Sequence, residues 1–283
     1  MIFLRQYSSC STAGLKQLDL QLIGQINRIC PDLLIRIDTI EGVDLGPACH
    51  PYLQAPAASA LMRAIIKRRK RIKVNSAYRT LAQQAVLFSH FQNKICNIRA
   101  AARPGASNHN TALSLDIEDA QGWKPYLEPQ GWDWIGSFDP MHFDFVGGGT
   151  KDMKWLSVKA FQQLHNFNNP RNKIAEDGQW GVATMIALNA VPCSGFAKVP
   201  GQISTVVAAP EFKPGLSPSL KKGMQGSAIA DLQKKLIEKG YKITADAVFG
   251  DVTERAVILF QRENGLDADG VVGLLTKKEL DLA

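Results

Sequence analysis

The sequence predicts an α+β domain followed by a small all-α domain. Two segments in which apolar and polar residues strictly alternate, 112–117 and 141–146, predict neighbouring β-strands. Apolar residues at helical spacing recur within 220–282, and a stretch rich in proline and glycine, 195–219, separates them from the rest. With 283 residues, the chain has the length of about two domains.

The composition is that of a globular protein. Apolar residues make up 45% of the chain and charged residues 21%, which excludes a disordered protein. The net charge of +7 lies entirely before residue 211, so the first domain favours anionic partners such as nucleic acid, anionic lipid or an acidic wall polymer. No apolar stretch of about 18 residues exists, so no membrane-spanning helix is expected.

The densest basic run covers residues 67–73. We interpret it as the solvated end of a helix that leads into a strand, where cations suit the helix dipole. It lacks interleaved aromatic residues and a recognition motif, so no nucleic-acid partner is expected.

The cysteines and the N-terminus bear on the compartment. The five cysteines are irregularly spaced and contain no C-x-x-C, which argues against a disulfide framework and against a cysteine zinc site. The N-terminus has no long apolar segment, so no ordinary signal peptide is visible.

The five histidines all lie within the first 165 residues, and histidine-dependent chemistry must lie there too. His50, His90 and His165 have no partner that the sequence reveals and are interpreted as structural. His90 is expected to be half exposed, on a helix with Leu81, Ala85 and Phe88. The tryptophans before residue 139 are interpreted as core residues, with a substrate-lining edge as the alternative: Trp123, Trp132 and Trp134.

An internal repeat runs through the second half of the chain. The segment 246–253, DAVFGDVT, is echoed by 269–276, DGVVGLLT, and by an upstream copy at 177–184, DGQWGVAT. Each copy predicts a tight turn followed by a helix, because glycine permits the turn and Asp or Thr can cap the helix. For residues 154–192 two interpretations stay open: a degenerate half-repeat, or a helical extension of the first domain.

The stretch Leu220–Leu282 resembles the peptidoglycan-binding repeat domain of bacterial wall hydrolases. It contains the whole pattern of that domain: a Leu-Gln helix, Gly-Tyr, the first Asp-x-x-Phe-Gly turn, Ala-Val-x-x-Phe-Gln, and Asp-Gly-x-x-Gly-x-x-Thr. The resemblance implies a three-helix domain with peptidoglycan as its partner.

The alternating segments of the first domain carry a possible metal site. Asp116 lies on the polar face of the first segment, His109 at its entrance, and His142 on the polar face of the second segment. Pairing of the two strands could bring these side chains together. Two imidazoles and one carboxylate are the ligands of a catalytic zinc ion that keeps an open position for water.

The same residues resemble a signature of the zinc D-Ala-D-Ala carboxypeptidases. Residues 107–116, SNHNTALSLD, resemble Ser-x-His-x-x-Gly-x-Ala-x-Asp, and 139–142, DPMH, resembles the closing Glu/Asp-x-x-His motif. Residues 76–80, SAYRT, resemble the upstream Gly-Tyr-Arg-Ser segment, and the motifs follow the order of the family. This family includes vancomycin-resistance-type carboxypeptidases and L-Ala-D-Glu endopeptidases. Here Ala112 replaces the family's glycine and Ser114 its alanine.

The resemblance implies an antiparallel-sheet zinc peptidase domain with flanking helices and a role for each site residue. Zinc would be held by His109, Asp116 and His142, and Asp139 would be the general base. Arg79 would bind a substrate carboxylate or stabilise the oxyanion, and Ser107 would be a hydrogen-bond donor in the site.

These observations predict four segments: a zinc peptidase domain at 1–153, the half-repeat or helical extension at 154–192, a linker at 193–219, and a peptidoglycan-binding domain at 220–283. The predicted function is zinc-dependent hydrolysis of stem peptides, as a D,D-carboxypeptidase or an endopeptidase, with peptidoglycan as the partner. The alternative is a non-catalytic, zinc-containing wall-binding protein, which would be expected to lose Asp139 or Arg79. The expected location is the cell wall or periplasm, and a phage-type lysin fits as well.

Overall fold

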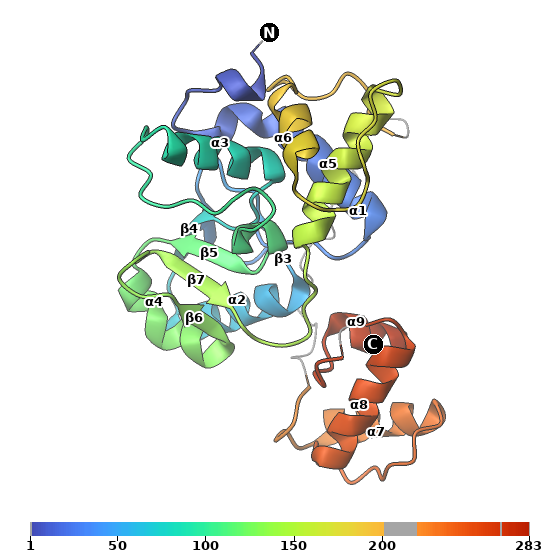
Figure 1. The fold of residues 1–283 in the computed structure, drawn as a ribbon. Coiled ribbons are helices and arrows are strands. Elements are labelled where there is room, and N and C mark those ends of the chain that lie inside the picture. The colour runs from blue at the N-terminus through green and yellow to red at the C-terminus, as the bar shows by residue number, and fades with distance from the viewer. Residues whose placement is uncertain (1, 201–219, 267, 283) are drawn as a thin grey trace.

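The computed structural model describes residues 2–200, 220–266 and 268–282. Figure 1 shows a larger N-terminal unit and a smaller helical C-terminal unit, with the uncertain residues as a grey trace. Most of the predicted linker, 201–219, lies outside the described residues.

A five-stranded sheet in the order β2-β4-β5-β7-β6 lies at the centre of the N-terminal unit. Its strands are β2 (Val43–Leu45), β4 (Ile72–Ser76), β5 (Ser114–Ile117), β6 (Trp132–Trp134) and β7 (His142–Phe145). All neighbours are antiparallel except β2 and β4, which are parallel. The predicted antiparallel sheet is therefore confirmed for four strands. The parallel pair arises because a helical crossover, α2 (Ala55–Arg68), lies between β2 and β4 in the chain.

The remaining elements of this unit are a small sheet and the helices. The small antiparallel sheet pairs β1 (Ile35–Arg36) with β3 (Tyr52–Leu53). The other helices and short 3₁₀ turns are η1 (Leu4–Gln6), η2 (Thr12–Leu15), α1 (Lys16–Ile29), α3 (Leu81–Gln92), η3 (Asn108–Thr111), α4 (Ala120–Leu127), η4 (Glu128–Gln130), α5 (Lys154–Asn168) and α6 (Val182–Asn189).

Helices α2 and α4 supply the largest core together with the sheet. The apolar residues of β5 and β7, Leu115, Ile117, Phe143 and Phe145, are buried in it, as the alternation predicts. Trp123 and Trp132 are also buried there, which confirms them as core residues, and Trp134 packs against the same core. The basic run follows its interpretation: α2 ends at Arg68, Arg69 turns through a left-handed conformation (φ 53°), and β4 begins at Ile72.

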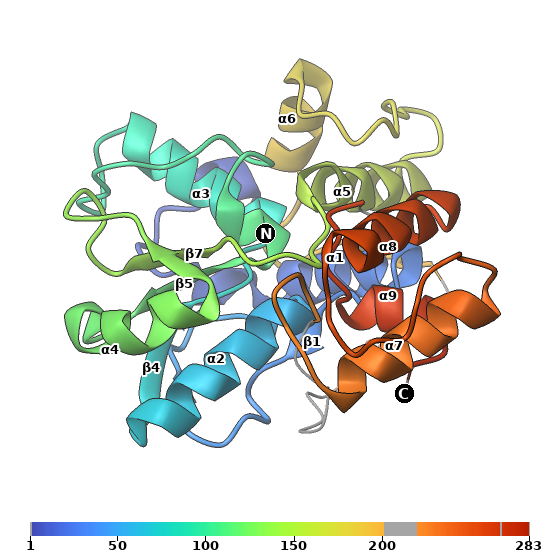
Figure 2. The ribbon, with the colours of Figure 1, turned by 90° about the horizontal axis from the view of Figure 1, so that it is seen from below.

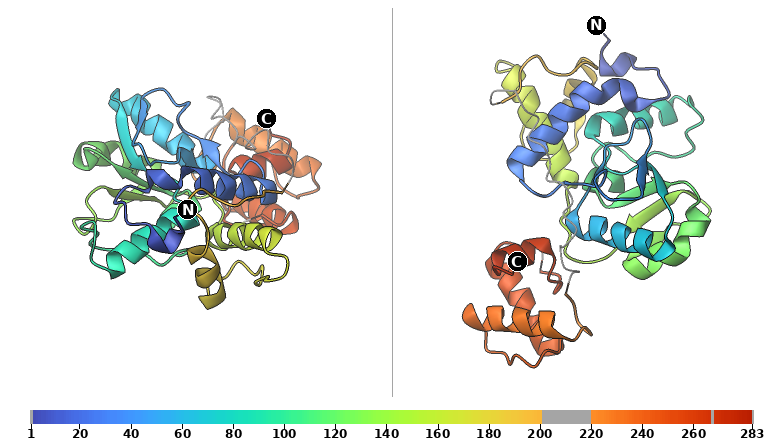
Figure 3. Two further views of the ribbon diagram at one scale, coloured as in Figure 1. Left: turned by 90° about the horizontal axis from the view of Figure 1, so that it is seen from above. Right: turned by 180° about the vertical axis from the view of Figure 1, so that it is seen from behind.

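Helices α1, α3, α5 and α6 form the other half of the unit. Helices α1 and α5 pack along each other, as Figure 2 and Figure 3 show. Residues of α3, α5 and α6 share one buried cluster that includes Leu81, Phe161 and Leu188. Residues 154–192 therefore pack as part of this unit.

Two expectations from the sequence are wrong, and the N-terminal segment explains both. Cys10 and Cys96 form a disulfide, although the odd cysteine count argued against such bonds. His90 is only 2% exposed rather than half exposed, and its Nε2 lies 3.0 Å from the carbonyl oxygen of Tyr7. Residues 7–10 cover the end of α3, a contact between distant parts of the chain that spacing along the sequence does not reveal.

The C-terminal unit is the small all-α domain that the sequence predicts. It consists of α7 (Ser227–Glu238), α8 (Asp251–Glu263) and α9 (Leu274–Glu279). Its core includes Leu232, Phe249, Phe260 and Val272, so the apolar residues of both repeat turns are buried between the helices. In the part of the chain that the structure describes, no helix has both the length and the apolar character needed to cross a membrane.

Candidate active site

Two cross-strand pairs of polar residues form one side of the site. Strands β5 and β7 pair so that Asp116 lies opposite His142 and Ser114 lies opposite Asp144. Since side chains two residues apart share a face, all four point to the same side of the sheet. The predicted pairing of the two alternating segments is confirmed.

His109 comes from the short turn η3, which precedes β5. The turn ends at Ala112, which adopts a left-handed conformation (φ 58°). Glycine is favoured at such a φ, which accounts for the glycine of the family pattern that Ala112 replaces. The His109 Nδ1 lies 2.7 Å from the carbonyl oxygen of Ala77, so the ring is held with Nε2 toward β5 and β7.

The three predicted ligands meet at one point. His109 Nε2 lies 3.1 Å from Asp116 Oδ1 and 3.2 Å from His142 Nδ1, and His142 Nδ1 lies 2.9 Å from Asp116 Oδ1. A tetrahedral zinc ion with bonds of about 2.0–2.1 Å separates its ligand atoms by only slightly more, about 3.3–3.4 Å. The three side chains form a group that could hold a metal ion.

The hydrogen bonds of the two histidines show that this group suits a cation. His109 donates from Nδ1 to Ala77, and His142 donates from Nε2 to Asp144 Oδ1 at 2.8 Å. In the neutral rings the other two nitrogens therefore carry lone pairs, and both face a carboxylate oxygen. Three acceptors that converge without a hydrogen repel one another unless a proton on His142 or a metal cation lies between them. The residues present thus fit a metal ion.

The pKa shifts reflect the same convergence of negative charge and lone pairs. Burial alone lowers the pKa of His142, but its hydrogen bonds to Asp116 and Asp144 outweigh burial and raise it to about 9. Burial alone raises the pKa of Asp116, yet His109, His142 and Arg79 hold it well below its ordinary value. Burial and the charge of Arg79 lower the pKa of His109.

Asp144 is a site residue to which the sequence assigned no role. Besides accepting from His142, it accepts from Ser114 Oγ at 2.6 Å and from Asn108 Nδ2 at 2.8 Å. Burial alone raises its pKa, but these three hydrogen bonds lower it to about 2. The alternating pattern had placed Asp144 beside His142, and only the register revealed its partners. The hydroxyl of Ser114, where the family pattern has alanine, holds this carboxylate.

Arg79 lies at the end of β4, just before α3. Its guanidinium donates to Asp116 Oδ2 and Ser76 Oγ, both at 3.1 Å, and to Gln84 Oε1 at 3.2 Å. Burial lowers its pKa, and the charges of Asp116 and Asp139 oppose that shift. The guanidinium is thus a fixed cation next to the possible metal ligands.

A buried cluster behind Arg79, which the sequence did not reveal, positions this segment. Asp19 of α1 is 1% exposed; it accepts from Thr80 Oγ1 at 2.5 Å and lies 2.9 Å from His50 Nε2. Burial raises the pKa of Asp19. Thr80 also caps α3 by accepting from the Gln83 amide. Asp19 thus connects α1 to the segment of Arg79 through Thr80, and His50 is buried beside it.

Asp139 begins a turn that leads into β7. The His142 amide donates to the Asp139 carbonyl oxygen at 3.1 Å across Pro140, whose fixed φ suits the second position of a β-turn. Asp139 is half buried and lines the same cavity as the three possible ligands.

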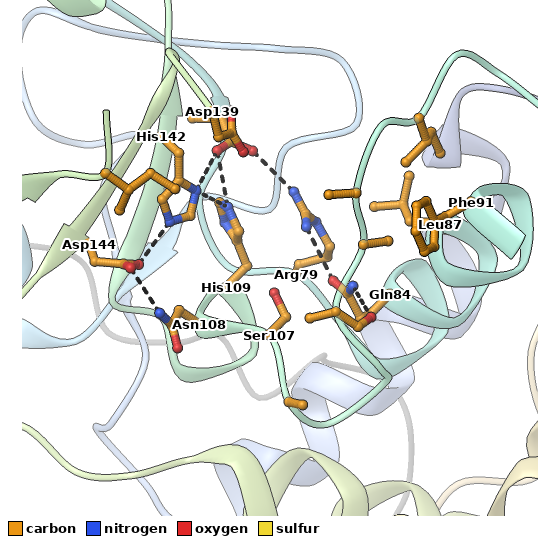
Figure 4. A pocket seen from close by; sticks show the side chains of 17 residues that line it. Arg79, Gln84, Leu87, Phe91, Ser107, Asn108, His109, Asp139, His142 and Asp144 are labelled. Carbon is orange, nitrogen blue, oxygen red and sulfur yellow. Dashed lines mark hydrogen bonds and ion pairs between the residues drawn. The ribbon is translucent and has the colours of Figure 1, made fainter. Parts of the chain in front are cut away.

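That cavity has a volume of about 600 Å³. Figure 4 shows His109 and His142 on one side, Arg79 at the centre, and Leu87 and Phe91 of α3 beyond it. Ser107 is buried and lines the cavity, so all six predicted site residues meet here. A second cavity of about 360 Å³ shares Asn108 and Asp144 with the first and continues toward Lys151 and Lys154.

Parts of this chain are similar to known proteins. A protein of Bacillus licheniformis described as a probable N-acetylmuramoyl-L-alanine amidase is 43% identical over 67 residues, which are 23% of this chain and 19% of that protein. The N-acetylmuramoyl-L-alanine amidase CwlL of the same organism is 41% identical over 64 residues, 22% of this chain and 18% of that protein. This chain therefore spans less than a fifth of the length of either relative.

Solved structures give short matches of the same kind. A peptidoglycan-binding protein of Clostridioides difficile, in complex with glutamine hydroxamate, is 35% identical over 23% of this chain and 41% of its own, with a TM-score of 0.23. The SleB N-terminal domain is 36% identical over 22% of this chain and 88% of its own, with a TM-score of 0.22.

Two families match longer and separate parts of the chain. Residues 51–167, which contain every candidate site residue described above except Asp19 and His50, match the D-alanyl-D-alanine carboxypeptidase family. Residues 225–280 match the peptidoglycan binding domain. Residues 51–167 are thus a domain of the D-alanyl-D-alanine carboxypeptidase family, and residues 225–280 are a C-terminal peptidoglycan-binding domain.

Proposed function

We propose that this protein is a zinc-dependent peptidase that hydrolyses peptide bonds in the stem peptides of peptidoglycan. The carrying observation is the convergence of His109 Nε2, Asp116 Oδ1 and His142 Nδ1, whose lone pairs face one another at 2.9–3.2 Å. The C-terminal domain keeps the enzyme on its polymeric substrate and raises the local concentration of bonds to cleave. Its site of action is extracytoplasmic, at the wall.

The proposed mechanism divides the chemistry among the residues of the cavity. Bound zinc would supply a water of lowered pKa and a Lewis acid for the scissile carbonyl. His109, Asp116 and His142 would hold the ion. Asp139 takes the proton from the attacking water and returns it to the leaving amine. Arg79 stabilises the negative charge that develops on the carbonyl oxygen, or binds a substrate carboxylate.

The cavity has room for substrate on both sides of the candidate ligands. The larger cavity, about 600 Å³, extends to Leu87 and Phe91, and the smaller one, about 360 Å³, extends to Lys154. A carboxypeptidase, which removes a terminal residue, needs only one of the two cavities for the longer part of its substrate. An endopeptidase needs both cavities, because its substrate continues on both sides of the scissile bond. The proposal therefore covers both bond choices within the stem peptide.

Mass spectrometry of purified peptidoglycan after digestion tests the proposal. We expect new amino and carboxyl ends within stem peptides, and none with Asp139→Asn. Cleavage between the glycan and the stem peptide, the amidase activity named for the two Bacillus relatives, would contradict it. An absence of any new ends with zinc-loaded protein would favour the alternative, a non-catalytic wall-binding protein.

A further inference from the structure

Each of the two turns of the C-terminal domain has its own buried glutamine, and both glutamines make the same pattern of hydrogen bonds. Gln233 donates to Asp246 Oδ1 (2.7 Å), to the carbonyl oxygen of Val248 (3.0 Å) and to Thr253 Oγ1 (3.0 Å), and accepts from the Ala247 amide (2.8 Å). In the second turn Gln261 makes the same bonds to Asp269, Val271, Thr276 and the Gly270 amide, at 2.9, 2.9, 3.3 and 2.9 Å.

The same network occurs a third time, within the N-terminal unit. Gln162 of α5 donates to Asp177 Oδ1 (2.9 Å), to the carbonyl oxygen of Gln179 (3.2 Å) and to Thr184 Oγ1 (3.2 Å). It accepts from the Gly178 amide at 2.8 Å. Helix α5, this turn and α6 therefore reproduce the unit formed by α8, the second turn and α9.

We propose that residues 154–192 are a third peptidoglycan-binding unit, fused to the peptidase domain, which holds a wall strand beside the active site. The peptidase family match ends at residue 167 and the binding-domain match begins at 225, so neither accounts for this turn or for α6. The inference rests on the proposed function, because it supplies a second contact for the same substrate.

The third unit carries exposed apolar side chains around its turn, as expected of a binding face. Met185 and Ile186, 41% and 61% exposed, stand where the first C-terminal turn is followed by Glu254 and Arg255. Val182 is 70% exposed and Trp155 is 49% exposed. The Trp155 backbone lies directly against Gly178 of the turn. An exposed indole offers the flat apolar surface on which sugar rings stack.

The third unit also borders the catalytic cavity. Trp180 of the turn lies near Gly105, since a Cβ placed on Gly105 would come within 3.8 Å of the Trp180 Cβ. Gly105 is followed by Ala106 and Ser107, which line the cavity that holds the candidate ligands. A strand bound along the turn would therefore pass the active site.

One contact within the chain brings a backbone amide to such a turn. Asp269 uses Oδ1 within its own network, and its Oδ2 accepts a hydrogen bond from the backbone amide of Gly149. Asp177 uses Oδ1 in the same way, so its Oδ2 is placed to accept an amide of a stem peptide. An aromatic face for sugars next to a carboxylate for peptide amides matches the two components of peptidoglycan.

Footprinting of the full chain tests the site directly. Hydroxyl-radical oxidation is measured by mass spectrometry, with and without soluble peptidoglycan fragments at concentrations that saturate binding. We expect Trp155 and Met185 to be protected about five- to tenfold, and Ile66 on α2, which is 61% exposed, to be unaffected. Unchanged oxidation of Trp155 and Met185 at saturation would overturn the proposal.

Kinetics separates this inference from the proposed function. Trp155→Ala should lower hydrolysis of intact sacculi about five- to tenfold and leave hydrolysis of a soluble stem peptide unchanged. Trp155→Phe should retain most of the activity on sacculi, and Ile66→Ala is the matched control. Equal losses on both substrates, or no loss on sacculi, would refute the third binding unit. Failure of the unaltered protein on the soluble peptide would instead refute the peptidase function.

Discussion

The metal-ligand group and the repeat turns are both clusters of buried polar side chains, but their hydrogen bonds differ in kind. Around Gln233 the amide hydrogens and acceptors of the network pair with one another. Around Asp116 two imidazole nitrogens and a carboxylate oxygen converge, and the pKa of His142, raised to about 9, shows that this group favours positive charge. A closed network stabilises a fold by itself, whereas converging acceptors need a cation. The hydrogen bonds thus distinguish the cluster around Gln233, which is suited to stabilise the fold, from the cluster around Asp116, which is suited to bind a cation.

Removal of a possible metal ligand should have the largest effect on zinc content and on hydrolysis. His109→Ala, Asp116→Ala and His142→Ala should each lower zinc content and abolish measurable hydrolysis, because a three-ligand site loses its geometry with any one of them. Metal analysis together with hydrolysis of a soluble stem peptide checks this. Chelation should have the same effect on hydrolysis and should leave binding to sacculi intact, since the C-terminal turns need no metal. Full zinc content in all three variants would contradict the assignment.

Loss of the proposed base should leave the metal in place. Asp139→Asn should retain zinc and fold, and turnover of the soluble peptide should fall about 10²–10⁴-fold, the usual contribution of general acid–base catalysis. The pairing of zinc analysis with turnover distinguishes a base from a ligand. Near-normal turnover would exclude Asp139 from the chemistry.

Asp144 should matter less than a ligand and more than an ordinary surface carboxylate. Asp144→Asn removes the carboxylate that fixes the ring of His142, and zinc affinity should fall about 10–100-fold. Competition with a chelator of known affinity measures it. Asp133→Asn is the matched control, because Asp133 lies opposite Asp144 on β6 and is exposed. Equal zinc affinities for the two variants would show that Asp144 does not orient His142.

Disruption of a closed network should affect stability and leave the chemistry unchanged. Gln233→Leu leaves the partners of a buried amide unpaired, and the C-terminal domain should lose about 1–3 kcal/mol of unfolding free energy. Thermal unfolding and denaturant titration measure the loss, and Gln225→Leu, at an exposed position, is the control. Hydrolysis of the soluble peptide should not change. A loss of that hydrolysis would mean that the two domains share the active site.

The sequence predicted that His109, Asp116 and His142 come together, because local alternation and chain order determine their grouping. Residues 112–117 and 141–146 alternate so regularly that burial of Leu115 and Phe143 places Asp116 and His142 on the opposite face. The helical C-terminal domain was predictable for a similar reason, since each repeat turn has its own local signal.

Contacts between distant segments could not be predicted in the same way. Asp19 pairs with His50 and Thr80 from a helix far upstream, and Cys10 reaches Cys96 across 86 residues. The parallel pairing of β2 with β4 depends equally on how a crossover packs. The sequence placed Asp144 beside His142, but its role depends on Ser114 and Asn108, which the register of the strands brings near.

A crystal structure of the zinc-loaded protein, with anomalous data collected on both sides of the zinc absorption edge, tests the central claim most directly. We expect one fully occupied anomalous peak in the N-terminal unit, bonded to His109 Nε2, Asp116 and His142 Nδ1 at about 2.0–2.2 Å. A fully occupied zinc ion elsewhere, with none of these three residues as a ligand, would contradict it.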